Sequence, residues 1–96
     1  MLCGEFVKLC NSETEFGEPQ WFHKLNKNRI LEVTHEEYGL SKNNQYYSCR
    51  VHCSDKEYED GFYRGSIGII DAITVMDEAF DAENILRWAN AVANNC

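Results

Sequence analysis

The clearest pattern of apolar positions lies near the C-terminal end of the chain, in residues 81–94. Apolar side chains recur there at spacings of three and four residues, which is typical of the buried stripe of an amphipathic helix: Ile85, Trp88, Ala89, Val92 and Ala93. Asp81 precedes the stripe and can accept hydrogen bonds from the first free backbone amides, so the helix is predicted to begin there. With Trp88 as its largest anchor, the stripe needs a second layer to cover it.

Two segments in the middle of the chain alternate between apolar and polar residues with a period of two, which indicates half-buried strands. In residues 29–36, the imidazole of His35 shares the apolar face and is predicted to be packed. In residues 45–53 the alternation is stricter, with Tyr47 on the apolar face and His52 exposed on the opposite face. Two antiparallel strands joined by a turn follow from this pattern.

Residues 62–76 keep the same period of two over a greater length. They are predicted to form a strand with a break or bulge at Asp71 and Ala72. A helix over residues 71–80 is the alternative, because the segment is long for a single strand.

The N-terminal part of the chain is less regular. Residues 5–11 suit either a strand or one helical turn, and a strand is preferred. Pro19 suits the first position of a short helix over residues 19–26. The whole pattern predicts one α+β domain over residues 1–96, with an antiparallel three- to four-stranded meander, a C-terminal helix packed on one face and a short N-terminal helix.

Composition narrows the classes of function. The 96 residues carry a net charge of −7, which argues against direct binding to nucleic acid or to an anionic membrane, since both need a basic surface. No apolar run approaches the roughly 18 residues of a membrane span. The first residues lack a basic segment followed by an apolar one, so no secretory signal is expected and a cytoplasmic location is predicted.

The five cysteines are expected to be reduced thiols, mostly buried, because their number is odd and no signal peptide precedes them. Cys49 and Cys53 would lie about 13 Å apart in a strand, with His52 on the other face, so they cannot hold one metal ion together. The chain carries no phosphate-binding loop and no signature of a hydrolase. Neither a metal, a cofactor nor an enzymatic activity is predicted, although a thiol- or metal-dependent enzyme built on these cysteines and a histidine is an alternative.

Acidic residues are grouped in two segments, residues 55–60 and residues 71–83. If the two groups fall on one side of the fold, their carboxylates would imitate the spaced charge of a phosphate backbone and occupy a basic groove. Tyrosine among these charges suits a protein interface. The residues predicted to contact such a partner are Asp55, Glu57, Tyr58, Glu59, Asp60, Asp77 and Glu78. The alternative is a solvated surface that serves only solubility.

The order of elements in the second half of the chain resembles that of small phage-encoded inhibitors of bacterial defence, of which the anti-CRISPR proteins are the best-known kind. The resemblance rests on the run Ile67-Gly68-Ile69-Ile70, the acidic run Asp77-Glu78-Ala79-Phe80-Asp81 and the helix that continues through Ala93. It implies a non-catalytic protein in the host cytoplasm that binds a defence effector and blocks its DNA-binding surface or its assembly.

The predicted function is therefore that of a protein-binding inhibitor whose partner is basic or binds nucleic acid. An antitoxin or immunity protein that neutralises a basic nuclease would show the same acidity and is the alternative within this class. An exposed strand edge would also permit a homodimer, although the sequence does not select the strand.

Overall fold

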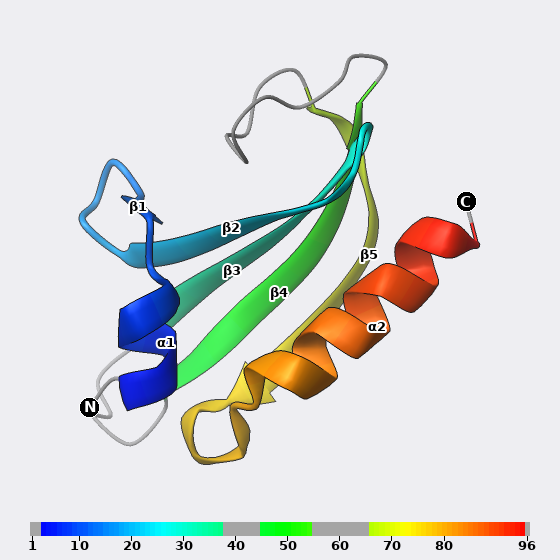
Figure 1. Ribbon diagram of the computed structural model, residues 1–96. Helices are drawn as coiled ribbons and strands as arrows, with labels where there is room; N and C mark the ends of the chain where they lie inside the picture. Colours follow the sequence, from blue (N-terminus) through cyan, green and yellow to red (C-terminus); the bar gives the residue numbers. More distant parts are fainter. Residues whose placement is uncertain (1–2, 38–44, 55–65, 96) are drawn as a thin grey trace.

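The computed structural model describes residues 3–37, 45–54 and 66–95 (Figure 1). The elements follow one another as α1 (Gly4–Leu9), β1 (Ser12–Glu13), β2 (Pro19–Asn26), β3 (Arg29–Glu37), β4 (Gln45–Ser54), β5 (Ser66–Met76), the 3-10 helix η1 (Asp77–Ala79) and α2 (Ala82–Asn94). The strands form one antiparallel sheet in the order β1-β2-β3-β4-β5. The predicted architecture, an α+β meander with a C-terminal helix and a short N-terminal helix, is confirmed, but the sheet has five strands instead of three or four and the N-terminal helix lies at residues 4–9 instead of 19–26.

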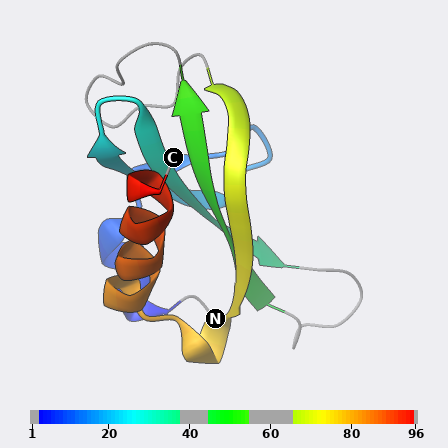
Figure 2. The same ribbon diagram turned by 90° about the vertical axis from the view of Figure 1, so that its right-hand side faces the viewer.

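Both helices lie on the same side of the sheet, so the fold has two layers (Figure 2). Alternate side chains of the strands point into the space between the layers, where α2 packs mainly against β2, β3 and β4. The buried core residues from the strands are Trp21, Leu31, Val33, Tyr47, Cys49 and Val51, and those from the helical segments are Phe6, Phe80, Ala82, Ile85 and Ala89. The opposite face of the sheet, which we call the open face, is covered by no helix in the described part of the chain.

The C-terminal helix begins as the sequence predicts. Asp81 is the N-cap, and its Oδ1 accepts hydrogen bonds from the amides of Glu83 at 3.0 Å and Asn84 at 3.3 Å. The deepest side chain of the stripe is Ala89, which is fully buried, whereas Trp88 is only half-buried. Trp88 is therefore not the main anchor of the helix, because the small residues let the helix backbone lie close to the sheet.

The two predictions for the N-terminal part are wrong: the predicted strand is a helix, and the predicted helix is a strand. The segment preferred as a strand contains helix α1, which buries the single side chain Phe6. The segment predicted as a helix is strand β2, in which Trp21 is buried and pairs with Val33 of β3. Pro19 is the first residue of this strand, a position where its missing N–H removes no bond of a central ladder.

The long strand β5 confirms the preferred prediction, and the alternative helix over residues 71–80 is wrong except for the short turn η1. Val51 pairs with Asp71 while His52 pairs with Ile69, so the extra residue of the bulge is Ile70. The bulge therefore lies one residue before the predicted break. Residues 62–65 of the predicted strand lie outside the described residues.

Candidate functional site

The residues predicted to contact a partner divide into two groups. Asp55, Glu57, Tyr58, Glu59 and Asp60 all lie outside the described residues. Asp77 and Glu78 are the first two residues of η1, which joins the end of β5 to the start of α2.

Glu78 belongs to a group of carboxylates that the fold gathers where α1, η1 and α2 begin (Figure 1). The amide of Ala82 donates a hydrogen bond to Glu5 Oε1 at 3.3 Å, which holds the first turn of α1 against the first turn of α2. We call this group the acidic corner, and it consists of Glu5, Asp77, Glu78, Asp81 and Glu83. The basic residues of the same three helical elements are Lys8 and Arg87, so the corner is negatively charged.

Three of these five carboxylates hold the fold together. Asp81 caps α2 and Glu5 accepts the amide of Ala82, as described above. Asp77 Oδ1 accepts a hydrogen bond of 2.7 Å from the hydroxyl of Tyr47, and the same hydroxyl accepts the amide of Cys3 at 3.0 Å. Burial raises the pKa of Tyr47, and the bond to Asp77 raises it further, so the phenol stays protonated and keeps donating. Asp77 thus holds η1 to Tyr47 of β4, whose hydroxyl also holds the residue that precedes α1.

The other two carboxylates are free to meet a partner. Glu78 is exposed and forms no hydrogen bond or ion pair with any described residue. Glu83 forms an ion pair with Arg87 at 3.6 Å, but both side chains are largely exposed, and such pairs contribute little stability. Glu78 is among the residues predicted from the sequence to contact a partner and Glu83 is not, although both lie in the acidic segment of residues 71–83.

A second group of polar residues lies on the open face of the sheet. Glu32 of β3 pairs with Arg50 of β4, and its neighbour across the diagonal is His52. Glu32 Oε1 lies 3.2 Å from His52 Nε2, and Glu32 Oε2 lies 3.4 Å from Arg50 Nη1 and 3.4 Å from the hydroxyl of Thr34. His52 is only 4% exposed, so the prediction that it is exposed is wrong. The register of β3 and β4 brings His52 into this cluster.

Burial alone would raise the pKa of Glu32, but the hydrogen bond from His52, the charges of His52 and Arg50, and the hydrogen bond from Thr34 together hold the pKa below its ordinary value. The carboxylate is therefore ionised at neutral pH and satisfied by three partners. Because Glu32 is 7% exposed and His52 4% exposed, a reactant cannot reach the pair without moving the side chains around it. The arrangement suits a structural cluster that fixes the strand register, not an acid–base pair.

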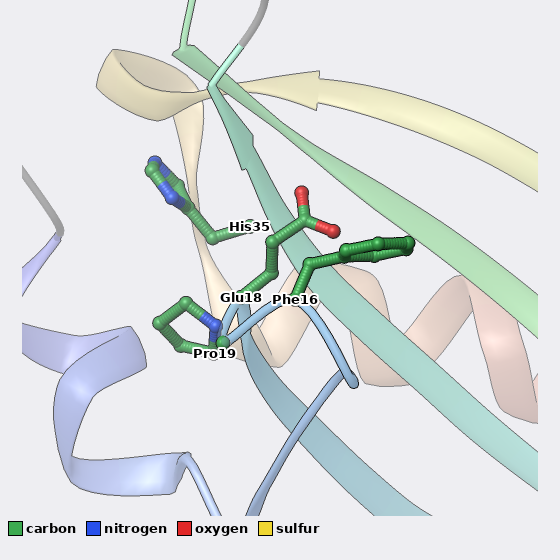
Figure 3. A pocket seen from close by; sticks show the side chains of 5 residues that line it. Phe16, Glu18, Pro19 and His35 are labelled. Carbon is green, nitrogen blue, oxygen red and sulfur yellow. The ribbon is translucent and has the colours of Figure 1, made fainter.

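A shallow hollow lies at the start of β2, lined by Phe16, Gly17, Glu18, Pro19 and His35 (Figure 3). In this view the imidazole of His35 and the carboxylate of Glu18 point to opposite sides, so the hollow does not bring an acid and a base together. His35 is instead packed as predicted, with its ring centre 5.0 Å from that of Tyr47. Its Nε2 has no hydrogen-bond partner among the described residues.

The cysteines show no arrangement for chemistry in the described part of the chain. Cys49 and Cys53 lie on the helix side of β4, and His52 lies on the open face, as the alternation predicts. Burial raises the pKa of the Cys49 thiol to about 12, so it is not a nucleophile at neutral pH. Among the described residues, no group of three histidines, cysteines or carboxylates is placed to hold a metal ion.

Comparison with models of known protein families, with curated proteins and with solved structures finds no match to this chain. None of the helices in residues 3–37, 45–54 and 66–95 combines the length and the apolar character that crossing a membrane requires.

Proposed function

We propose that this chain is a non-catalytic protein-binding inhibitor that uses the acidic corner to engage a basic protein. The observation that supports this proposal is the exposure of Glu78 and Glu83 on a rigid frame. The frame is held by the Tyr47–Asp77 bond, the Ala82–Glu5 bond and the cap at Asp81. The backbone that carries these carboxylates loses little conformational freedom on binding because it is already held in place, and a negative patch steers a positive partner towards it.

The class of partner follows from the same charges. A nucleic acid would be repelled by the corner, so the proposal excludes direct nucleic-acid binding and favours a protein whose basic surface itself binds nucleic acid. The resemblance to phage-encoded inhibitors of bacterial defence extends the proposal to an anti-CRISPR-like role in the host cytoplasm. An antitoxin or immunity role would use the same surface on a single dedicated nuclease.

The test is an affinity pull-down of the tagged full chain from host lysate, compared between two variants with the same change in net charge. Glu78→Gln with Glu83→Gln removes the free charges of the acidic corner. Glu13→Gln with Glu15→Gln removes two exposed charges from the β1–β2 hairpin, which lies away from the corner in Figure 1. We expect the first variant alone to lose the partner.

Equal retention of the partner by both variants would overturn the role of the corner. Capture of a nucleic acid by the purified chain at low salt would overturn the choice of partner class. Both double variants should unfold at the same denaturant concentration as the wild type, because these side chains form no buried contact.

A further inference from the structure

Strand β5 forms one border of the sheet, and its outer edge is not paired with any strand in the described part of the chain (Figures 1 and 2). An unpaired edge offers a row of backbone donors and acceptors to another strand. The first half of β5 is interrupted by the bulge at Ile70, but pairing with β4 is regular from Ala72 to Met76. Only this second half, which we call the open edge, has the regular geometry that strand addition needs.

The direction of the backbone groups along the open edge can be traced across the whole sheet. The backbone amide and the carbonyl oxygen of Phe22 bond to the side chain of Asn11, so these two backbone groups point away from β3. Since bonded positions alternate along antiparallel strands, this fixes which residues face which neighbour at every step from β2 to β5. The pairs that carry this argument across the sheet are Phe22–Glu32, Glu32–Arg50 and Arg50–Ala72. The backbone N–H and C=O groups of Ala72, Thr74 and Met76 therefore point outwards, away from β4.

A separate observation on β5 gives the same answer. The amide of Ala72 donates a hydrogen bond of 2.8 Å to the exposed carboxylate of its own neighbour Asp71, so this amide does not bond to β4. The amides of Thr74 and Met76 are therefore the next outward donors, and the carbonyl oxygens of Ala72 and Thr74 are the outward acceptors between them.

Charge selects the strand that fits. The open edge itself carries no charge, but Asp71 precedes it, and Asp77 and Glu78 of the acidic corner follow it. A second copy paired antiparallel over the whole open edge would be centred on Thr74 and would place Asp71 of each copy beside Asp77 of the other. Like charges in facing positions destabilise such a pair. A strand with basic residues at both ends meets carboxylates at both ends instead.

We propose that residues 72–76 of β5 accept an added strand from a partner protein, uncharged over about five residues and flanked by lysine or arginine. This inference rests on the proposed function, since it describes how the basic partner is held. Main-chain bonds to the open edge provide affinity, and the flanking carboxylates provide selectivity and orientation.

The test uses the full chain and a synthetic peptide as the probe, Lys-Val-Thr-Val-Thr-Val-Lys, followed by amide hydrogen exchange in NMR. In the free protein the amides of Thr74 and Met76 should exchange fast and those of Ile73 and Val75 slowly. Saturating peptide should slow exchange at Thr74 and Met76 by at least about tenfold, because both amides become bonded. The same peptide with glutamate at both ends should give no protection.

Two variants of one residue separate backbone pairing from side-chain contact. Thr74→Pro removes the outward N–H, while a proline at an edge position leaves the bonds to β4 in place. Thr74→Ala removes the side chain and keeps the N–H. We expect Thr74→Pro to weaken peptide binding at least about tenfold and Thr74→Ala to leave it nearly unchanged. Slow exchange at Ile73 and Val75 in both variants would show that β5 is intact.

Each other outcome overturns the inference. No protection at millimolar peptide removes the open edge as a docking site, and equal protection by the glutamate peptide removes the role of charge. Protection that appears without peptide and grows with protein concentration identifies a second copy as the occupant. In the lysate experiment, the double variant Glu78→Gln with Glu83→Gln could lose the partner while Thr74→Pro retains it. This result would refute the open edge as the docking site and leave the proposed function intact.

Discussion

The two edges of the sheet are built from similar backbone but end in opposite ways. At the β2 edge, β1 pairs with Pro19 and Gln20, the amide of Asn11 donates to the carbonyl of Gln20, and the side-chain amide of Asn11 bonds both backbone groups of Phe22 at 2.9 Å. At the open edge of β5, the outward amide of Ala72 bonds Asp71, and β5 pairs with no second strand beyond β4 in the described part of the chain. Among residues 3–37, 45–54 and 66–95, the chain closes the β2 edge itself and leaves the regular half of the β5 edge unpaired.

This difference is informative because an unpaired strand edge tends to pair with strands of other chains. The β2 edge shows that a short strand and one asparagine side chain are sufficient to close an edge in this fold. Of the described helices, α2 packs mainly on β2, β3 and β4 and does not cover the β5 edge. The basic strand proposed above would close this edge.

The largest expected effect on stability comes from removing the buried side chain of α1, the helix that precedes the closed β2 edge. Phe6 is fully buried, with its ring centre 4.7 Å from that of Tyr47 and 5.5 Å from that of Phe80. Phe6→Ala should lower the free energy of unfolding in urea by about 3–5 kcal/mol. Because Asn11 follows α1 directly, exchange at the amide of Phe22 should also accelerate.

The matched control is Val7→Ala in the same helix, since Val7 is exposed by 52%. It should change the free energy of unfolding by no more than about 0.5 kcal/mol. A loss below about 1 kcal/mol for Phe6→Ala would mean that α1 does not hold the closed edge in place.

The outcome at the N-terminal part shows what the sequence alone cannot decide. Trp21 and Leu25 are four residues apart, which suits a helix, but Trp21, His23 and Leu25 also alternate, which suits a strand. Pairing with β3 decides between these patterns, and that contact is made with residues far along the chain. In contrast, α2, β3, β4 and β5 carry long patterns of one period, and their structures follow the prediction.

The buried cluster on the open face was missed for a related reason. The alternation places Arg50 and His52 on the face away from the core, and a polar side chain there is expected to be solvated. Only the register of β3 against β4 shows that Glu32 lies beside both of them. The one signal in the sequence was the opposite charge of Glu32 and Arg50 on adjacent strands. For the acidic corner, the sequence shows that the segment is acidic. It does not show that the carboxylate of Asp77 is bonded to Tyr47 within the fold and is therefore not available to a partner.

A smaller effect is expected from the Glu32 cluster, in which Thr34 of β3 and Arg50 and His52 of β4 contact the carboxylate. Glu32→Gln exchanges charged hydrogen bonds for neutral ones and should lower the free energy of unfolding by about 2 kcal/mol at neutral pH. Because the pKa of Glu32 is lowered in the fold, its ionised form stabilises the protein above the ordinary value of 4.5, and this stabilisation is lost as the pH falls towards the folded pKa.

The wild type should therefore lose more stability than Glu32→Gln between about pH 6 and about pH 3, measured by urea unfolding at each pH. Arg50→Gln is the matched variant, since Arg50 is half-exposed and its loss should have a weaker effect at neutral pH. Parallel pH curves for the wild type and Glu32→Gln would contradict the assignment of the lowered pKa to this cluster.

The smallest expected effect tests the closed edge directly. Asn11→Ala removes two hydrogen bonds at an exposed position and should lower the free energy of unfolding by about 1 kcal/mol. Asn90→Ala, at an exposed position of α2, should change it by no more than about 0.5 kcal/mol. The sharper readout is amide exchange: in the wild type Phe22 should be slow and Thr74 fast, and in Asn11→Ala both should be fast. If Phe22 stays protected without the Asn11 side chain, the two edges do not differ through this contact, and β1 alone must account for the closure of β2.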